Sequence, residues 1–205
     1  MTGIREAKKQ IRRERIFSAG IQLFNERGFE ATHMETVAKQ AGVAIGTLYN
    51  YYQNKGDLLL AILVKDGDLQ RMRIETMVDQ DGFDVPMMVR RLVEIFLQDS
   101  FEFITRDMLR RSIATMLIEP ATSFAKIYQQ DLERYLRSLK RVLKDQVNRG
   151  QLSAAADIEF LSEVIFNAIN IELILYCLNP SKDPSPHKAK LSRTLLRLLA
   201  PDTVA

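Results

Sequence analysis

The spacing of apolar residues along this chain of 205 residues predicts a protein built of α-helices. Over most of the length, apolar side chains recur every three or four positions, which is the period of one helical face. No β-hairpin signal and no internal repeat is evident. The expected helices are one that ends at Gly28, segments at about 33–40, 44–52, 57–78, 84–104, 105–119, 123–148 and 157–178, and a last one containing Leu191 to Leu199.

Two short predicted helices joined by a tight turn stand out between Gly28 and Lys55. The first begins with a capping-box signal, because Thr32 is followed three residues later by Glu35. Gly42 is expected to end this helix in the left-handed conformation, which costs glycine little. The second helix starts at Ala44. Two helices joined by a short turn with glycine form the helix-turn-helix pattern of many DNA-binding proteins.

The outward residues of the second helix suit a helix end inserted into a DNA groove, because they are short, uncharged or able to form hydrogen bonds. The residues expected to contact base edges are Ala44, Ile45, Gly46, Tyr49 and Asn50, with sugar and phosphate as the alternative for Tyr49. The residues expected to contact phosphates are Thr32 and His33, at a helix amino terminus, and Thr47, Tyr51 and Lys55. An ordinary helical corner with solvated polar residues is the alternative.

These residues resemble the tetracycline-repressor (TetR) family of transcriptional regulators. The similarity covers about the first sixty residues and rests on Gly28-Phe29, Ala31-Thr32, Val37-Ala38, Ala41-Gly42-Val43, Gly46-Thr47-Leu48-Tyr49, Tyr51-Tyr52, Lys55 and Leu58-Leu59. The chain departs from the family pattern in three places. Ala44 and Ile45 replace a pair that is often polar or basic, which favours apolar contact with a base, for example a thymine methyl group. Tyr52 replaces a usual Phe, and Gly56 replaces a usual helix former.

The resemblance implies an all-α protein of two domains. Residues 1–55 would form an N-terminal three-helix DNA-binding domain with the helix-turn-helix, and residues 56–205 a C-terminal helical domain for effector binding and dimerisation. It implies a dimeric repressor that binds a palindromic operator when empty and is released by a small-molecule effector. A ligand-activated regulator of the same fold and a helical adaptor that does not bind DNA are the alternatives.

Basic charge is concentrated around the predicted helix-turn-helix. Residues 1–55 contain nine Lys or Arg and five Asp or Glu, whereas the remaining residues contain 20 and 21, for a net charge of +3. Neutralisation of DNA phosphates would use this excess. The first residues, which include Arg5, Lys8 and Lys9, are expected to form a flexible arm that either follows a phosphate backbone or stays solvated.

Composition and motifs also indicate which other classes of protein the chain does not resemble. The apolar content of 46% and charged content of 27% are typical of soluble globular proteins. A single cysteine, Cys177, fits a reducing cytosol, and neither a signal peptide nor a long uncharged run is present, so a cytoplasmic location without membrane contact is expected. Only His33 and His187 are present, with no zinc spacing, phosphate loop or dinucleotide fingerprint, so no enzyme, metal or cofactor is expected.

The segment 157–178 is apolar nearly all round and must therefore be covered on every side. Together with the leucines of the last helix, it is expected to form the four-helix bundle of a two-fold homodimer. Burial inside a monomer is the alternative.

The methionine and aromatic residues of the middle helices fit an adaptable apolar cavity, although such residues are more often plain core. The resemblance implies that an effector binds among them. Asn167 and Asn170, on an otherwise apolar helix, are expected either to point inward or to pair across the dimer. The candidate ligand-binding residues are Phe96, Ser100, Met108, Met116, Tyr128, Asn167 and Asn170.

Overall fold

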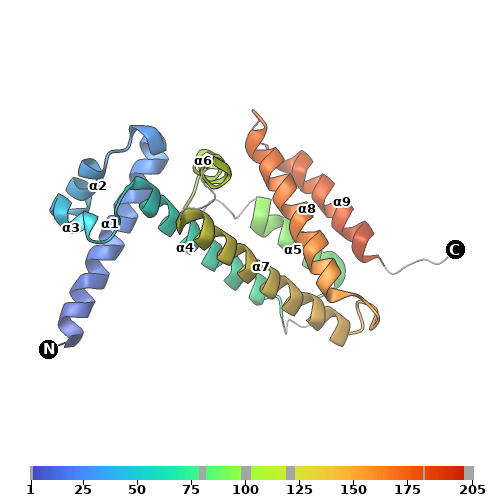
Figure 1. Ribbon diagram of the computed structural model, residues 1–205. Helices are drawn as coiled ribbons and strands as arrows, with labels where there is room; N and C mark the ends of the chain where they lie inside the picture. Colours follow the sequence, from blue (N-terminus) through green and yellow to red (C-terminus); the bar gives the residue numbers. More distant parts are fainter. Residues whose placement is uncertain (1, 79–81, 98–102, 119–122, 182, 201–205) are drawn as a thin grey trace. The chain divides into compact units, whose positions relative to one another are not determined.

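The computed structural model describes residues 2–78, 82–97, 103–118, 123–181 and 183–200, and helix is the regular secondary structure throughout these ranges (Figure 1). The all-α prediction is confirmed. In chain order the helices are α1 (Thr2–Ala31), α2 (Met34–Ala41), α3 (Ile45–Tyr49), α4 (Lys55–Glu75), α5 (Val85–Leu97), α6 (Arg106–Ile118), α7 (Ser123–Asn148), α8 (Ile158–Leu178) and α9 (Ser185–Leu199).

Three expectations about helix ends are wrong. The residues after Thr2 belong to α1, so the predicted flexible arm is helical. Near its other end, α1 has non-helical dihedral angles at Gly28 (φ 80°, ψ 164°). α3 ends at Tyr49 rather than Tyr52. α5 ends at Leu97 among the described residues, and the segment 103–105, predicted to be helical, is irregular.

The chain divides into two compact units, which are described separately. The first unit contains Met1–Asp66 and Phe103–Tyr128, and the second contains Gly67–Glu102 and Gln129–Ala205. The first unit thus includes α6 as well as the helix-turn-helix. The functional boundary after residue 55 stays a prediction, but the structural division falls later, within α4.

The first unit is built on a core shared by α1, α2, α3 and the first half of α4 (Figure 1). Ile16, Leu23, Val37, Leu48 and Leu58 are fully buried, with 0% of their surface exposed. α1 and α4 approach closely at Gly20, where an added Cβ would lie 2.8 Å from Leu58 Cδ2. This core holds α3 on the surface of the unit.

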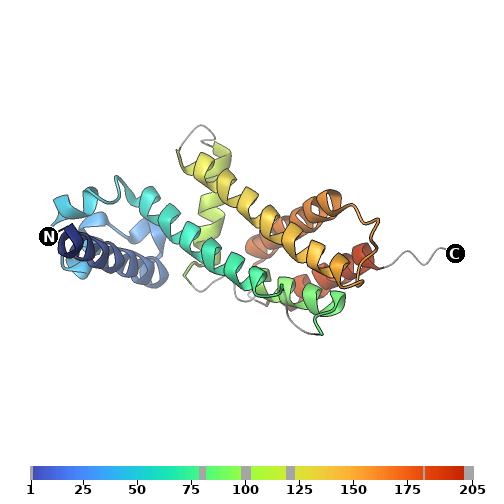
Figure 2. The same cartoon turned by 90° about the horizontal axis from the view of Figure 1, so that it is seen from below.

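In the second unit the later half of α4 lies beside α7 (Figure 2). Tyr135 Oη donates a hydrogen bond of 2.6 Å to Gln70 Oε1, and the buried Arg71 pairs with Asp68 and Asp131. Burial raises the pKa of Asp131, and Arg71 opposes this rise. Apolar residues of α5, α7, α8 and α9 complete the core.

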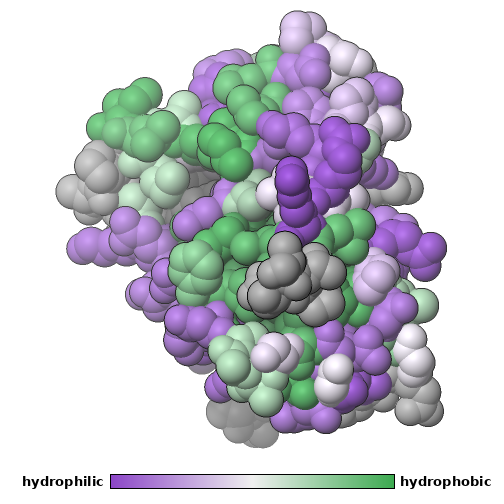
Figure 3. All heavy atoms as spheres, turned by 90° about the vertical axis from the view of Figure 1, so that its right-hand side faces the viewer, coloured by the Kyte–Doolittle hydropathy of each residue, from purple (hydrophilic) through white to green (hydrophobic). Residues whose placement is uncertain are grey.

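α8 is covered on only part of its surface. Asp157 caps its first turn, since Asp157 Oδ1 accepts a hydrogen bond of 3.0 Å from Phe160 N. The helix packs mainly against α5 and α9, and it also contacts α7 through Phe166 and Glu159. Phe160, Ile171 and Leu178 stay more than half exposed, at 56%, 53% and 64%. Apolar patches are visible on the side where α8 and α9 lie (Figure 3). The face left open in one chain is the face predicted to meet a second copy.

Within the described residues, α8 is the one helix whose length and composition would allow it to cross a membrane, with a mean hydropathy of 1.6 and 39% of that stretch buried. A core helix of a soluble protein meets the same criterion. The buried Glu172 of α8 lies 2.7 Å from His187 Nδ1 and 2.8 Å from Lys190 Nζ, both on α9. This charge is therefore paired within the helical unit.

Candidate nucleic-acid interface

α2 and α3 form the predicted helix-turn-helix. Gly42 ends α2 with φ 63° and ψ 43°, as the sequence predicted, and Val43 N donates a hydrogen bond of 3.0 Å to Ala38 O. Ala44 then adopts an extended conformation, and its carbonyl oxygen accepts hydrogen bonds from Thr47 N and Leu48 N. The turn is fixed by backbone hydrogen bonds on both sides, so the direction of α3 is well defined.

The residues predicted to contact base edges are the exposed residues of α3 and its ends. They are Ala44, Ile45, Gly46, Tyr49 and Asn50. Leu48 and Tyr52 lie on the opposite, buried face. An added Cβ at Gly46 would meet no atom within 4 Å, so this side of α3 is open. The structure thus gathers this group on one surface.

Thr32 is directed away from that surface. Its side chain is buried (1% exposed), and Oγ1 donates to Gly28 O at 2.8 Å and lies 3.2 Å from Leu23 O. The capping-box prediction is wrong, because the residue that precedes α2 is His33 and α2 has no side-chain cap. Thr32 instead ties α2 to the end of α1. His33 is exposed beside the open amino terminus of α2, where a phosphate could be bound.

Lys55 contacts the end of α1. Its Nζ donates to Phe29 O at 2.6 Å and Glu30 O at 3.1 Å, and lies 4.4 Å from the centre of the Phe29 ring. Arg111 of α6 also approaches this ring, at 5.0 Å, and pairs with Glu30. Burial lowers the pKa of Lys55; Glu30 opposes this effect, and Arg111 adds to it. Lys55 therefore has a structural role that the sequence did not reveal.

Tyr51 contacts the amino-terminal part of α1. Its hydroxyl donates a hydrogen bond of 3.1 Å to the carbonyl oxygen of Lys9. The basic residues of this part of the helix are all exposed: Arg5, Lys8, Lys9, Arg12 and Arg13. Half-buried Thr47 is the remaining residue predicted to contact phosphate. The basic charge that the sequence assigned to a flexible arm is thus carried on a helix tied to the end of the helix-turn-helix.

The predicted effector residues are divided between the two units. Met108 and Met116 belong to the first unit, whereas Phe96, Asn167 and Asn170 belong to the second. Ser100 and the side chain of Tyr128 lie outside the described residues. Asn167 is exposed, so the expectation that it points inward is wrong within one chain, and Asn170 Nδ2 donates to Phe166 O at 2.8 Å. Phe96 is buried, with its ring 5.5 Å from that of Tyr135.

Gln146 of α7 is a candidate that the sequence analysis missed. It is fully buried, and neither atom of its amide has a hydrogen-bond partner in the part of the chain that the structure describes. A buried amide without partners is costly, and a bound polar group would satisfy it. The available signal was a glutamine on the apolar stripe of α7, three residues after Leu143.

Residues 16–62 match the sequence profile described as "Bacterial regulatory proteins, tetR family". This segment contains all of α2 and α3 and the parts of α1 and α4 that support them. These residues form a DNA-binding segment of the tetR family. The resemblance predicted from the residues of the helix-turn-helix is therefore confirmed, and with it the prediction of a DNA-binding transcriptional regulator.

Relatives of known description support this membership of the tetR family. The chain is 25% identical over 187 residues to a fatty acid metabolism regulator protein of Bacillus subtilis, which covers 90% of this chain and 91% of the relative. It is 44% identical to the transcriptional repressor KstR of Rhodococcus jostii, but only over 55 residues, about a quarter of each chain. The first relative is described as a regulator protein and the second as a transcriptional repressor.

Solved tetR-family structures share the fold. Thermus thermophilus FadR, in complex with lauroyl-CoA, has a TM-score of 0.68 and 23% identity, covering 94% of this chain and 95% of that chain. SmeT, in complex with triclosan, has a TM-score of 0.67 and 22% identity, covering 95% and 94%. As the family membership implies, the expected partners are operator DNA, a second copy of the chain and a small-molecule effector.

Proposed function

We propose that this tetR-family protein is a cytoplasmic, non-catalytic repressor that binds a palindromic operator as a dimer and is released by a fatty acyl-coenzyme A. The observation that supports DNA reading is the exposed surface of α3, held in place by a buried Leu48 and Tyr52. Such an uncharged, open helix face fits the major groove, where base edges are read.

The proposed DNA interface keeps most of the predicted residues but assigns them differently. Ala44, Ile45, Gly46, Tyr49 and Asn50 contact base edges or the adjoining sugars. His33 and Thr47, with the exposed cations of α1, contact phosphates. Thr32, Tyr51 and Lys55 hold the interface in shape, because their polar atoms already bind backbone carbonyl oxygens.

The proposed effector follows from similarity over nearly the whole chain. The B. subtilis relative is described as a regulator of fatty acid metabolism and is similar well beyond the DNA-binding segment. In the second unit, the rings of Phe96, Tyr135 and Phe166 are neighbours in the core, and Met77 and Met88 are buried in the same cluster. Flexible methionines allow such a core to open around an acyl chain. The unpaired amide of Gln146 would bind a polar group of the ligand.

Release by the effector requires that it favours one arrangement of the two DNA-binding heads over another. The contacts of Arg111 with Phe29 and Glu30 make α6 part of the structure that supports the helix-turn-helix. A change in the position of α6 would therefore change the support of α1.

The test is footprinting of the purified protein on DNA that flanks its own gene, followed by titration with lauroyl-CoA, lauric acid and coenzyme A. The expected result is protection of two half-sites an integral number of helical turns apart. Of the three titrants, only lauroyl-CoA should remove this protection. Protection that appears only when lauroyl-CoA is present would identify a ligand-activated regulator. Binding without base preference at every salt concentration would contradict the operator assignment.

A further inference from the structure

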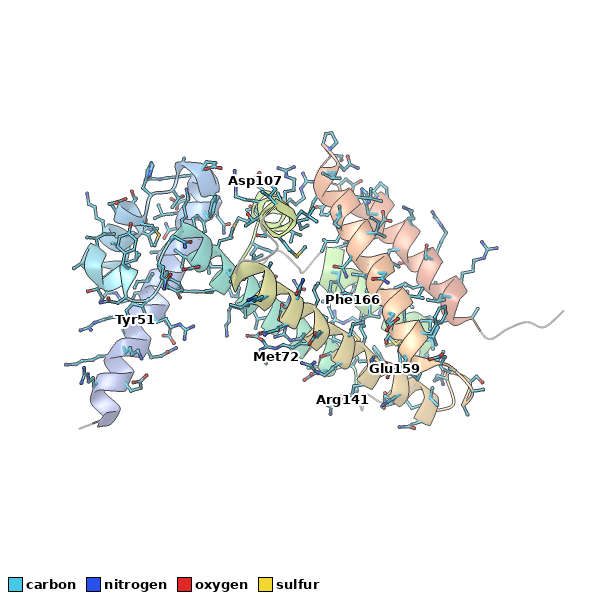
Figure 4. The ribbon with its side chains drawn as sticks, viewed as in Figure 1. Tyr51, Met72, Asp107, Arg141, Glu159 and Phe166 are labelled. Atoms are coloured by element: carbon cyan, nitrogen blue, oxygen red, sulfur yellow. The ribbon has the colours of Figure 1, made fainter. Side chains whose placement is uncertain are left out.

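A surface groove of about 540 Å³ in the second unit is lined by one side of α7 and by Val78. Its polar lining consists of Arg137, Lys140, Arg141, Lys144, Asp145 and Asn148. In Figure 4, Arg141 lies on the side of α7 turned away from the core residue Phe166. The groove is therefore distinct from both the apolar core and the helix-turn-helix.

Three of the cations have no counter-charge among the described residues. Arg137, Arg141 and Lys144 are exposed and form no hydrogen bond or ion pair within the structure as described. The neighbouring acids are already used, because Asp145 Oδ2 lies 2.7 Å from Arg149 Nε and Glu159 pairs with Lys140. The local charge of the groove is strongly positive.

The spacing of these cations makes that charge unfavourable in the empty protein. Positions 137, 141 and 144 lie on one face of the helix, and like charges at such spacings repel each other. Over seven residues the face rises by about 10 Å, at 1.5 Å per residue. An anionic ligand with charges spread over a similar length would relieve the repulsion at several points together.

We propose that this groove binds the phosphate groups of a nucleotide-bearing small molecule. Its volume lies within the usual range for small-ligand sites, about 300–1,000 Å³. Arginine forms paired hydrogen bonds to phosphate oxygens, lysine adds a compact positive charge, and the side chains of Val78 and Asn148 offer an apolar and a polar contact. The diphosphate and 3′-phosphate of coenzyme A have the required chemistry. The assignment of coenzyme A to the groove rests on the acyl-coenzyme A effector proposed above.

The test compares the wild-type full-length protein with the double variant Arg137→Gln/Arg141→Gln by isothermal titration calorimetry. The matched control is Arg90→Gln, which removes an exposed arginine of α5 outside the groove. The titrants are lauroyl-CoA, lauric acid and inorganic pyrophosphate, each at low and high salt. The double variant is expected to bind lauroyl-CoA about 30-fold more weakly than the wild type at low salt, with a smaller salt dependence, and lauric acid unchanged.

Each outcome decides between stated alternatives. Equal lauroyl-CoA affinity in the wild type and the double variant overturns the groove as the phosphate site. If lauroyl-CoA does not bind the wild type, the proposed effector is wrong, and pyrophosphate then decides the groove. If pyrophosphate binds the wild type and the Arg90→Gln control but not the double variant, the groove is a polyanion site. If pyrophosphate does not bind the wild type, the polyanion site is overturned. Operator DNA is titrated in the same way, and if only its affinity falls in the double variant, the occupant is DNA and the proposal is wrong.

Discussion

Replacement of Gly46 by alanine separates the folding role of α3 from its role in DNA binding. Gly46 lies within α3, and an added Cβ would have no other atom within 4 Å. The substitution therefore adds no steric conflict, while alanine loses less backbone entropy than glycine on forming a helix. The expected gain is about 0.5–1 kcal/mol in the free energy of unfolding, or roughly 1–4 °C in melting temperature for a chain of this size.

The same methyl group would lie on the surface proposed to enter the groove of DNA. It would hold α3 away from base edges, and we expect operator affinity to fall at least about tenfold, equivalent to about 1.4 kcal/mol. Thermal unfolding followed by circular dichroism and fluorescence anisotropy with labelled operator DNA measure the two effects.

A matched control is Gly56→Ala at the start of α4, where the new Cβ would lie 3.0 Å from Asn54 Oδ1. This variant should keep operator affinity, because Gly56 lies outside the proposed interface. A loss of stability in Gly46→Ala would show that α3 is not open as described. Unchanged operator affinity would show that Gly46 does not face DNA.

The remaining predictions concern structural polar residues and the dimer. Thr32→Val should lower the free energy of unfolding by about 1–2 kcal/mol in urea titrations and leave operator affinity unchanged, since the threonine hydroxyl donates a hydrogen bond to a carbonyl oxygen of α1. A loss of operator affinity without a loss of stability would show that Thr32 contacts DNA. Lys55→Met should lower the free energy of unfolding by about 1–3 kcal/mol in the same assay, because two hydrogen bonds and the contact with the Phe29 ring are lost. If stability is unchanged and the salt dependence of operator binding falls by about one phosphate contact, Lys55 instead binds a DNA phosphate. Asp131, with its pKa raised above 3.8 by burial, retains its proton more readily in the folded chain, so its contribution to stability falls as pH rises through its folded pKa. The stability of the wild type relative to Asp131→Asn should therefore be greater near about pH 4 than near about pH 7 in urea titrations, and the opposite trend would contradict this. Ile171→Glu should weaken dimerisation at least about 100-fold in sedimentation velocity experiments, because it places a charge on the exposed apolar face of α8; a dimer as tight as that of the control Glu163→Gln would exclude this face.

The sequence predicted those features that depend on backbone geometry and local periodicity. Gly42 ends α2 because glycine alone adopts φ 63° at low cost, and the exposed set of α3 follows from helical spacing. The helix predicted to start near residue 84 likewise begins with a local contact, since Asp84 Oδ1 accepts a hydrogen bond of 2.8 Å from Met87 N. Each of these signals is complete within a few residues of the chain.

The failed expectations involve partners that are distant in sequence or have equivalent local signals. A threonine before a helix looks the same whether its hydroxyl caps that helix or, as at Thr32, bonds the preceding one. A lysine such as Lys55 reaches far enough to contact either DNA or the end of α1, and only the tertiary structure distinguishes the two. The dimer interface stays a prediction, because the exposed apolar face of α8 is a property of one chain.

The contacts of α6 with α1 limit how this DNA-binding head could be transferred to another regulator. A hybrid joined after residue 55 would carry Phe29 and Glu30 but not Arg111, and would lose the hydrogen bond from Phe103 N to Asp66 Oδ1. The Phe29 ring of the transferred head would keep its contacts with Lys55 and Phe24 but lose the contact with Arg111. Functional exchange of operator specificity is therefore expected to require either α6 with the head, or the smaller replacement of α2 and α3 surface residues alone.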